Sequence, residues 1–165
     1  MNEITGKVWK LGDNIDTDAI APGEYLDAPI EEVVKHVFEH TRPEFAREDQ
    51  QGDIIVAGRN FGCGSSRENA PAALKELGIG CIAAVSFARI FFRNAIAIGL
   101  PVVICKGIPD IFNEGDAAVI DFRNARVRNA STGAELEGER FSDDILSIVE
   151  SGGILEKLKS VKELK

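Results

Sequence analysis

Residues 53–105 read DIIVAGRNFGCGSSRENAPAALKELGIGCIAAVSFARIFFRNAIAIGLPVVIC, and their pattern decides the fold. Short apolar runs alternate there with longer segments in which apolar residues recur every three or four positions. The short runs predict buried strands at 53–58, 81–86 and 101–105, and the longer segments predict helices at 66–77 and 87–99. An order of strand, helix, strand, helix, strand predicts a parallel sheet with right-handed crossover connections.

The flanking segments add elements to this core. Residues 31–40 have the apolar spacing of a helix, and the runs at 116–122 and 125–129 are typical of a β-meander. A further helix is predicted at about residues 142–149. Because the chain is short and has no repeat or low-complexity linker, we expect a single α/β domain over residues 1–165. It should have a parallel βαβαβ core and additional β-strands.

The composition excludes several classes of protein. A formal net charge of -8 argues against a nucleic-acid-binding surface, which needs clustered lysine and arginine. The longest apolar run, residues 95–105, is too short for a membrane span and is interrupted by Gly99 and Pro101. The first residues lack the basic and apolar regions of a secretion signal. We therefore expect a cytoplasmic protein with no membrane or nucleic-acid partner.

The three cysteines, Cys63, Cys81 and Cys105, form no C-x-x-C pair. Cys81 and Cys105 fall in predicted strands, where a buried free thiol is the usual state. The spacing favours neither a disulfide nor a metal site made by this chain alone. If iron–sulfur chemistry is involved in the function, the cluster is therefore expected on another chain.

The stretch GRNFGCGSSRENA, residues 58–70, contains the residues most suggestive of chemistry. A P-loop needs G-x-x-x-x-G-K, but this stretch has Cys63 at the second glycine position and no lysine. A dinucleotide-binding fingerprint needs a third glycine where Arg67 stands. Ser65 and Glu68 have the S-x-x-E spacing of a capping box, which predicts a helix start at this serine.

A capping box leaves Gly62, Gly64, the second serine and Arg67 unexplained. An arginine in the first turn of a helix opposes the helix dipole unless an anion lies nearby. A helix N-terminus with glycine-exposed backbone N–H groups and an arginine is typical of an anion site. We therefore expect a carboxylate or phosphate ligand here. A stand-alone anion-binding or nucleotide-binding module is the alternative from another functional class.

Residues 36–40, HVFEH, match the H-x-x-E-H zinc signature of one group of metalloproteases. A zinc site of that kind needs a further protein ligand, and the chain has only two histidines. The neighbouring valines and Phe38 supply the apolar face of the predicted helix, with His36 and His40 beside it. A chance match on a solvated helix face is the favoured interpretation, so no metal ligand is predicted in this chain.

Three blocks of the sequence resemble the small subunits of the aconitase superfamily. The signature block is GRNFGCGSSRENAPAALKELGIGCIAAVSFARIFFRNAIAIGLP at residues 58–101. An N-terminal block, GKVWKLGDNIDTDAIAPGEYL at 6–26, and a C-terminal block, ESGGILEKLK at 150–159, also match. The resemblance covers most of the chain, with residues 106–140 the least distinctive part.

The resemblance implies a swivelling β/β/α domain that closes over a separate large subunit. In the family that large subunit carries a [4Fe–4S] cluster, and this chain is expected to bind no cofactor. The two subunits together dehydrate and rehydrate a small 2-hydroxy dicarboxylic acid. The small subunit is therefore expected to be inert by itself, and able to self-associate through surfaces meant for its partner.

The family's functional residues fall on the two motifs quoted above. Ser65 matches the serine that acts as catalytic base, and Asp18 matches an aspartate that supports the site. Arg67 matches the arginine that binds a substrate carboxylate, a contact for which lysine is a poor substitute. Ser66 and Gly64 are expected to contact the substrate through the hydroxyl and the backbone.

The resemblance places a substrate-specificity loop at Tyr25, Leu26, Asp27 and Ala28. Many relatives have arginine where this chain has Glu24. A tricarboxylate such as homoaconitate brings a third negative charge that needs a cation, and residues 24–33 contain no lysine or arginine. We therefore expect interconversion of 2-isopropylmalate and 3-isopropylmalate, a step of leucine biosynthesis. The small subunits of 2,3-dimethylmalate dehydratase and homoaconitase are the alternatives.

Overall fold

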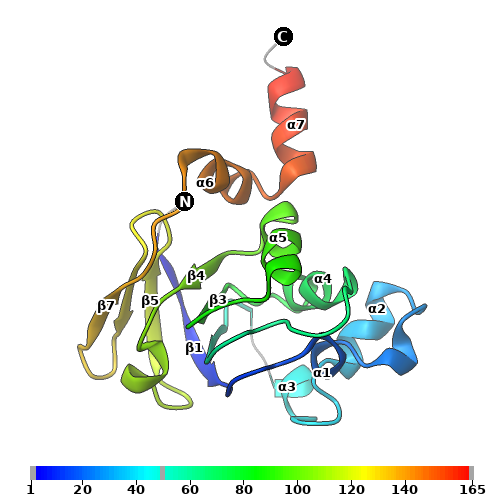
Figure 1. The fold of residues 1–165 in the computed structure, drawn as a ribbon, viewed down its shortest axis with the longest axis horizontal. Coiled ribbons are helices and arrows are strands. Elements are labelled where there is room, and N and C mark those ends of the chain that lie inside the picture. The colour runs from blue at the N-terminus through cyan, green and yellow to red at the C-terminus, as the bar shows by residue number, and fades with distance from the viewer. Residues whose placement is uncertain (1–2, 49–50, 164–165) are drawn as a thin grey trace.

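The computed structural model describes residues 3–48 and 51–163. Within these residues seven strands form one sheet in the order β4-β3-β2-β1-β5-β6-β7 (Figure 1). The strands are β1 Ile4–Lys10, β2 Ile54–Ala57, β3 Cys81–Ala84, β4 Val102–Ile104, β5 Ala117–Asp121, β6 Arg126–Asn129 and β7 Glu135–Glu137. The α/β fold class predicted from the sequence is confirmed, whereas the single domain over the whole chain stays a prediction.

The parallel half of the sheet consists of β1 to β4. Ile54 of β2 pairs with Val8 of β1 and with Cys81 of β3, and Ile82 pairs with Val102 of β4, all in parallel register. Every residue of β2 and β3 is buried, as expected for strands covered on both faces. The three buried strands and the parallel sheet predicted from residues 53–105 are therefore confirmed.

Strand β1 was not predicted, although it is the centre of the sheet. It pairs parallel with β2 on one side and antiparallel with β5 on the other, where Ile4 lies opposite Ile120. Strands β5, β6 and β7 form an antiparallel meander. This confirms the predicted β-meander and adds β7 to it.

Three of the longer helices follow the predicted pattern: α4 and α5 are shorter than predicted, and α6 is shifted by one residue. Helix α4 spans Asn69–Glu76, α5 Arg89–Ala97 and α6 Asp143–Glu150, and α4 packs on α5 and α5 on α6. The Ser142 hydroxyl caps α6 by accepting a hydrogen bond from the N–H of Ile145 at 3.3 Å. Helix α7, Ile154–Glu163, projects away from the sheet and the other helices in Figure 1.

Shorter helices lie in the connections between the strands, most of them in the connection between β1 and β2. They are α1 Thr17–Ile20, η1 Gly23–Tyr25, α2 Ile30–Val33, η2 Val34–His36, α3 Phe45–Glu48 and η3 Ile108–Ile111. The continuous helix predicted at 31–40 is wrong, because helical structure ends at His36. Val37 is extended and Phe38 has a left-handed φ of 57°, which turns the Phe38 ring against Phe45 at 4.9 Å.

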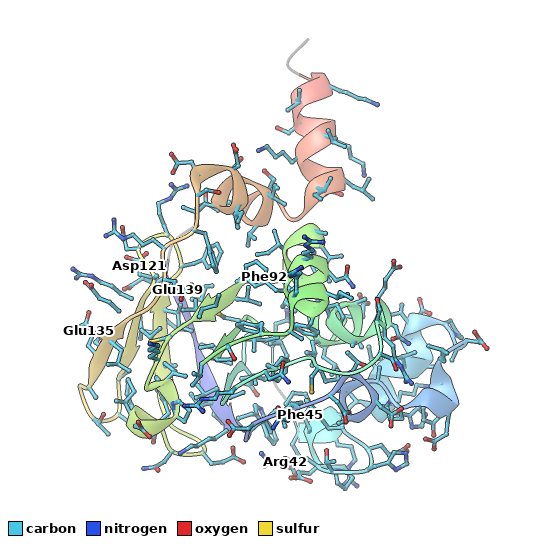
Figure 2. All side chains as sticks on the ribbon, in the orientation of Figure 1. Arg42, Phe45, Phe92, Asp121, Glu135 and Glu139 are labelled. Carbon is cyan, nitrogen blue, oxygen red and sulfur yellow. The ribbon has the colours of Figure 1, made fainter. Side chains whose placement is uncertain are left out.

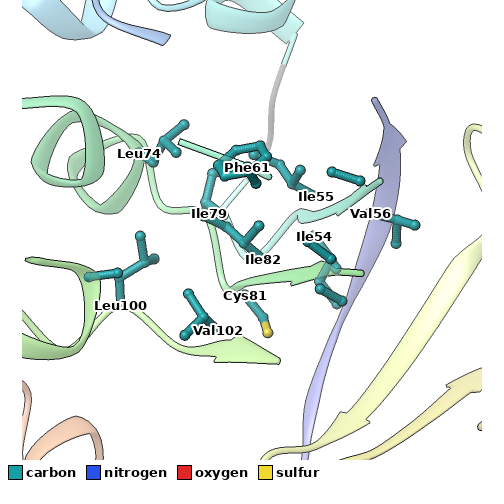
Figure 3. Packing of buried hydrophobic residues seen from close by; sticks show 14 of the residues in the cluster. Ile54, Ile55, Val56, Phe61, Leu74, Ile79, Cys81, Ile82, Leu100 and Val102 are labelled. Carbon is teal, nitrogen blue, oxygen red and sulfur yellow. The ribbon is translucent and has the colours of Figure 1, made fainter. Parts of the chain in front are cut away.

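The core lies between the parallel strands and helices α4 and α5. Figure 3 shows Ile54, Ile82, Leu74 and Leu100 among the buried side chains that fill this space. Each such side chain contributes about 1.5–3 kcal/mol when it is fully removed from water. This packing holds the first turns of α4 and α5 next to each other at one edge of the sheet.

A second group of contacts anchors β1 to the N-terminal helices. The Trp9 ring packs edge-on against Phe45 at 4.8 Å, and its indole N–H donates a hydrogen bond to Asp53 at 2.8 Å. The Arg42 guanidinium lies 4.9 Å from the centre of the Trp9 ring and pairs with Glu114. Figure 2 shows Arg42 and Phe45 together at this end of the molecule.

Candidate functional site

A pocket of about 350 Å³ lies where β1, β2 and β3 end. It is lined by residues of the connections that follow these strands, among them Thr17, Gly62, Ser65, Arg67, Arg89 and Asn94. Since the three strands are parallel neighbours, their carboxyl ends meet at the same edge of the sheet. Bridges between Asp16 and Cys63 and between Phe61 and Phe87 continue the parallel pairing into the pocket wall.

Gly62 fixes the path of the connection between β2 and α4. Its φ is 83°, and a Cβ atom added there would lie 2.2 Å from Cγ of Phe91. Its N–H donates to the carbonyl of Ile15 at 2.6 Å. Only glycine therefore lets this connection pass so close to the first turn of α5.

Ser65 is exposed in this pocket and is not a helix cap. Helix α4 begins at Asn69, four residues later, and no side chain caps its start. The capping box predicted at Ser65 is therefore wrong. The reason is that the Ser65 carbonyl accepts a hydrogen bond from Oγ1 of Thr17 at 2.7 Å, which holds this residue outside the helix. The Ser65 hydroxyl forms no hydrogen bond with any residue that the structure describes.

Gly64 and Ser66 flank this serine and line the same pocket. Both are exposed, and Gly64 has a left-handed φ of 91° with only ordinary contacts around it. Its conformation points to a requirement for glycine in the backbone turn rather than in packing. The structure thus brings together the three consecutive residues that the sequence singled out.

Arg67 and Asp18 meet beside the pocket, although they come from different blocks of the sequence. Nη1 of Arg67 donates hydrogen bonds to Oδ1 of Asp18 and to the carbonyl of Ala21, both at 3.1 Å. The Arg67 side chain is 16% exposed and that of Asp18 is 62% exposed. Within the described residues, the other N–H groups of Arg67 have no acceptor and are available to an anion.

Three polar residues of the pocket wall, Thr17, Arg89 and Asn94, were not predicted from the sequence. Arg89 is the first residue of α5, is exposed, and forms no ion pair with the part of the chain that the structure describes. Asn94 lines the same wall one turn further on. A usable signal existed, because Arg89 comes five residues after the end of strand β3 and the carboxyl ends of parallel neighbours share an edge of the sheet.

We call the pocket that contains Ser65 the serine pocket. The four residues of the expected specificity loop do not line it. Tyr25 ends η1, and Leu26 and Asp27 are exposed in the turn that follows. Ala28 instead lines a separate groove of about 650 Å³ between α2 and α4. The loop nevertheless connects to the pocket at its start, because the N–H of Gly23 donates to Oδ1 of Asp18 at 2.9 Å.

The histidines of the HVFEH segment pair with carboxylates. His36 contacts Glu32 and Glu39, and His40 contacts Glu24. Because residues 37–40 are not helical, the segment lacks the helix on which the zinc signature depends. Among the described residues, the ligand atoms of Glu24, Glu39 and His40 lie within 4.8 Å of one another.

Cys81 and Cys105 are buried, as predicted, and Cys63 is half-buried. All three are free thiols. Burial raises the pKa of the Cys81 thiol far above its usual value, so this group stays protonated and unreactive. None of the helices in the described part of the chain is long and apolar enough to cross a membrane.

The sequence matches the family model described as the aconitase C-terminal domain over residues 13–107, which is more than half of the chain. The chain belongs to the aconitase C-terminal domain family. The match includes every residue of the serine pocket and the start of the loop that contacts it. The aconitase-type resemblance of the sequence is therefore confirmed.

Relatives within this family carry names of two related activities. The chain is 52% identical to 3-isopropylmalate dehydratase small subunit 1 of Methanopyrus kandleri, over 94% of this chain and 92% of that protein. It is 54% identical to the methanogen homoaconitase small subunit of Methanothermobacter thermautotrophicus, over 92% and 88%. A crystal structure of 3-isopropylmalate dehydratase from Methanocaldococcus jannaschii superposes with a TM-score of 0.91 and 39% identity, covering 98% of this chain and 96% of that one.

Proposed function

We propose that this chain is the small subunit of a two-subunit hydro-lyase that isomerises a 2-hydroxy dicarboxylic acid, with 3-isopropylmalate as the preferred substrate. One observation carries the proposal: an exposed serine hydroxyl, with no hydrogen-bond partner among the described residues, lies in a pocket with Arg67 and Arg89. The names of the two relatives above agree with this reaction class.

Ser65 is assigned the role of base. As an alkoxide, its Oγ takes a proton from one carbon of the substrate while hydroxide leaves the neighbouring carbon, so an alkene, a neutral serine hydroxyl and a hydroxide ion are formed. Return of that proton and of hydroxide to the opposite carbons then gives the isomeric hydroxy acid and restores the alkoxide. The backbone N–H groups of the glycine-rich connection and the two arginines favour the alkoxide electrostatically.

The two carboxylates of the substrate need two cationic contacts. Arg67 is assigned to one carboxylate, together with Ser66 and the backbone of Gly64, and Asp18 keeps the guanidinium in place. Because Asp18 offsets the charge of Arg67, the second carboxylate needs another cation. Arg89 is the residue we assign to it, since it lines the same pocket and has no acidic partner within the described residues.

The aconitase type of reaction implies a [4Fe–4S] cluster, which needs several converging thiolates. The residues present do not fit such a cluster. Cys81 and Cys105 are buried in the core, and no cysteine joins a group of three ligand atoms in the described part of the chain. We therefore assign the cluster, and the acceptance of the leaving hydroxide, to a large partner subunit.

The choice of substrate rests on the loop after Pro22. It presents Glu24 and Asp27 and contains no lysine or arginine, so a third carboxylate would meet repulsion there. An alkyl group carries no such charge, which favours 3-isopropylmalate, then 2,3-dimethylmalate, over homoaconitate. Three free thiols also suit the reducing cytoplasm, where we place the protein.

The test is to co-express the chain with a candidate large subunit and measure kcat/KM for 3-isopropylmalate, 2,3-dimethylmalate and homoaconitate. We expect turnover only from the complex, and the highest value for 3-isopropylmalate. A higher value for homoaconitate contradicts the substrate assignment. Turnover by the pure small subunit contradicts the assignment of the cluster to a large partner subunit.

Arg89→Gln in the same complex tests the second cation. Loss of a charge-assisted hydrogen bond should raise KM by about tenfold or more, while the fold and assembly remain intact because the side chain is exposed. An unchanged KM removes Arg89 from the binding site.

Size-exclusion chromatography of the isolated chain tests self-association, which we expect because Leu155 of α7 is 74% exposed and Leu158 is 53% exposed.

A further inference from the structure

The HVFEH segment has no role in the proposed chemistry, yet it contacts the loop at Tyr25. The Tyr25 ring stacks on the imidazole of His36, with ring centres 3.7 Å apart and planes within 4° of parallel. The Tyr25 hydroxyl donates a hydrogen bond to Oε2 of Glu39 at 3.1 Å. The Tyr25 side chain is therefore fixed by stacking on the face of its ring and by a hydrogen bond from its hydroxyl.

His36 is itself fixed by two carboxylates. Its Nδ1 lies 2.8 Å from Oε1 of Glu39, and its Nε2 lies 3.0 Å from Oε1 of Glu32. Ionised carboxylates only accept hydrogen bonds, so both contacts are hydrogen bonds only when both ring nitrogens carry a proton, that is, when the ring is an imidazolium. The ring is only 20% exposed, and Tyr25 covers one face of it. A cation stacked on an aromatic ring adds a further attraction.

The opposite end of the loop contacts the serine pocket. The N–H of Gly23 donates to Oδ1 of Asp18, the same atom that accepts from Arg67. Two hydrogen bonds that share this oxygen therefore link the loop to Arg67. The pair of His40 and Glu24 also touches the loop, but both side chains are more than half exposed and their attraction is screened by water.

We propose that His36 and Glu39 are positioning residues that hold the loop of residues 23–28 through Tyr25, and so set the preference among alkyl malates. This inference deepens the proposed function and rests on it for the role in selectivity. The contact itself is independent of any reaction. It gives the HVFEH segment a function in place of the zinc site that its spacing resembles.

The proposal has a direction in pH. The pKa of His36 is raised by its hydrogen bond to Glu32 and, against burial, by the one to Glu39. We call the contact of Tyr25 with His36 and Glu39 the clamp. Because the folded-state pKa of His36 is raised, the clamp is present at low pH and weakens as pH rises through that value. Neutral imidazole donates from one nitrogen only, so one carboxylate then loses its donor.

Other charges near His36 leave this direction unchanged. Lys35 pairs with Glu32, and His40 pairs with Glu24. The packed helices α3 and α4 carry charged residues that form no ion pair or hydrogen bond with His36 in the described structure: Arg47, Glu48, Glu76 and Lys75.

Nuclear magnetic resonance on the full chain tests the clamp without any turnover. Tyr25 is the only tyrosine of the sequence, so ring-¹³C-labelled tyrosine reports on this residue alone. Its phenol pKa is raised, mainly by burial and by the bond to Glu39, so the phenol does not titrate near neutrality. We expect the Tyr25 ring signals to follow the titration of His36, and His36→Gln to abolish that pH step.

Lys35→Gln is the matched control, because this neighbouring side chain is 67% exposed and does not touch the loop. It should leave the Tyr25 titration in place. A pH step that survives in His36→Gln overturns the clamp. A shift of the Tyr25 and His40 signals by stoichiometric zinc, reversed by a chelator, assigns the cluster to a metal and also overturns it.

Kinetics of the complex with the large subunit test the role in selectivity. In His36→Gln and Glu39→Gln we expect the ratio of kcat/KM between 3-isopropylmalate and 2,3-dimethylmalate to change by about threefold to tenfold, as for residues that act through a neighbour. The change should appear in KM rather than kcat, and the wild-type KM should rise with pH through the His36 titration.

The outcomes are separable. An unchanged ratio in a complex that turns over refutes the role in selectivity. Absence of turnover with every malate refutes the proposed function and, with it, the role in selectivity, whereas the spectroscopic arm still decides whether the clamp exists.

Discussion

Ser65→Ala separates a chemical role of this serine from a structural one. The hydroxyl is exposed and bonds to no described residue, and the bond from Thr17 ends on the backbone carbonyl, which alanine keeps. An exposed substitution of this kind changes the free energy of unfolding by within about 0.5 kcal/mol. A capping serine would instead have lost about 1 kcal/mol.

The same change should remove most of the activity of the reconstituted enzyme. Loss of a general base lowers kcat by about 10²–10⁴-fold, which corresponds to roughly 3–5 kcal/mol in the barrier. Turnover is followed by the ultraviolet absorbance of the alkene intermediate, and stability by urea unfolding of the isolated small subunit. The two measurements together should show a large kinetic loss at unchanged stability.

Ser66→Ala is the control for this experiment, since Ser66 lines the same pocket and is equally exposed. It should raise KM and leave kcat within about tenfold, as expected for a binding contact. Near-wild-type turnover of Ser65→Ala refutes the assignment of the base. A loss of 1 kcal/mol or more in its unfolding free energy refutes the description of Ser65 as lying outside the helix cap.

Three further predictions concern binding and stability. Arg67→Lys should raise KM in the complex by about tenfold to hundredfold, because lysine lacks the planar fork that binds a carboxylate; an unchanged KM contradicts the role of Arg67. Gly62→Ala should lower the free energy of unfolding by about 2–4 kcal/mol through a left-handed φ and the contact with Phe91. Gly115 also has a left-handed φ, of 86°, but has open space around it. Gly115→Ala should therefore lower the free energy of unfolding only by the backbone contribution, and so by less than Gly62→Ala. Asn129→Ala should destabilise the chain by about 2–3 kcal/mol in urea unfolding, because this buried amide makes four side-chain hydrogen bonds with described residues.

The fold was predicted best where local pattern and long-range packing agree. The runs that became β2, β3 and β4 are apolar throughout, because both faces of these strands are covered. Strand β1 gave no comparable signal: only Val8 and Trp9 are fully buried in it, and its pairing with β5 joins residues far apart in the sequence. Such pairing depends on which strands come together in the folded sheet, and the sequence of one segment does not contain that information.

The segment at 31–40 shows how a correct pattern can give a wrong conformation. Its apolar spacing predicted a buried stripe of Val33, Val34, Val37 and Phe38; Val33, Val37 and Phe38 are buried, and Val34 is half-buried. A continuous helix was the simplest way to bury them, but the chain breaks at Val37 and uses a left-handed Phe38 instead. The contact of Phe38 with Phe45 comes from tertiary packing, which the spacing of one segment does not contain.

The site was predictable in the parts that are contiguous in the sequence. Glycine, serine and arginine stand together at 62–67, so their common location needed no knowledge of the fold. The contribution of Thr17 and Arg89 depends on which strands are neighbours, and β1 was not among the predicted strands. Resemblance to a family assigned Asp18 and Arg67 to the site separately, and the structure places the two side chains in direct contact.

The charges of the pocket also support the proposal that this chain acts together with a second one. Three parallel strands end at one edge and deliver a serine and two arginines to a pocket, but Asp18 already offsets the charge of Arg67. Arg89 is then the one cation of the described pocket wall that no acidic residue pairs with, whereas a malate-type substrate brings two negative charges. The alkoxide proposed for Ser65 would add a third, and no described residue of the wall is assigned to accept the leaving hydroxide. On the proposed mechanism the charge balance therefore requires further positive groups from outside the chain, which a cluster-bearing partner closing over this edge of the sheet would supply.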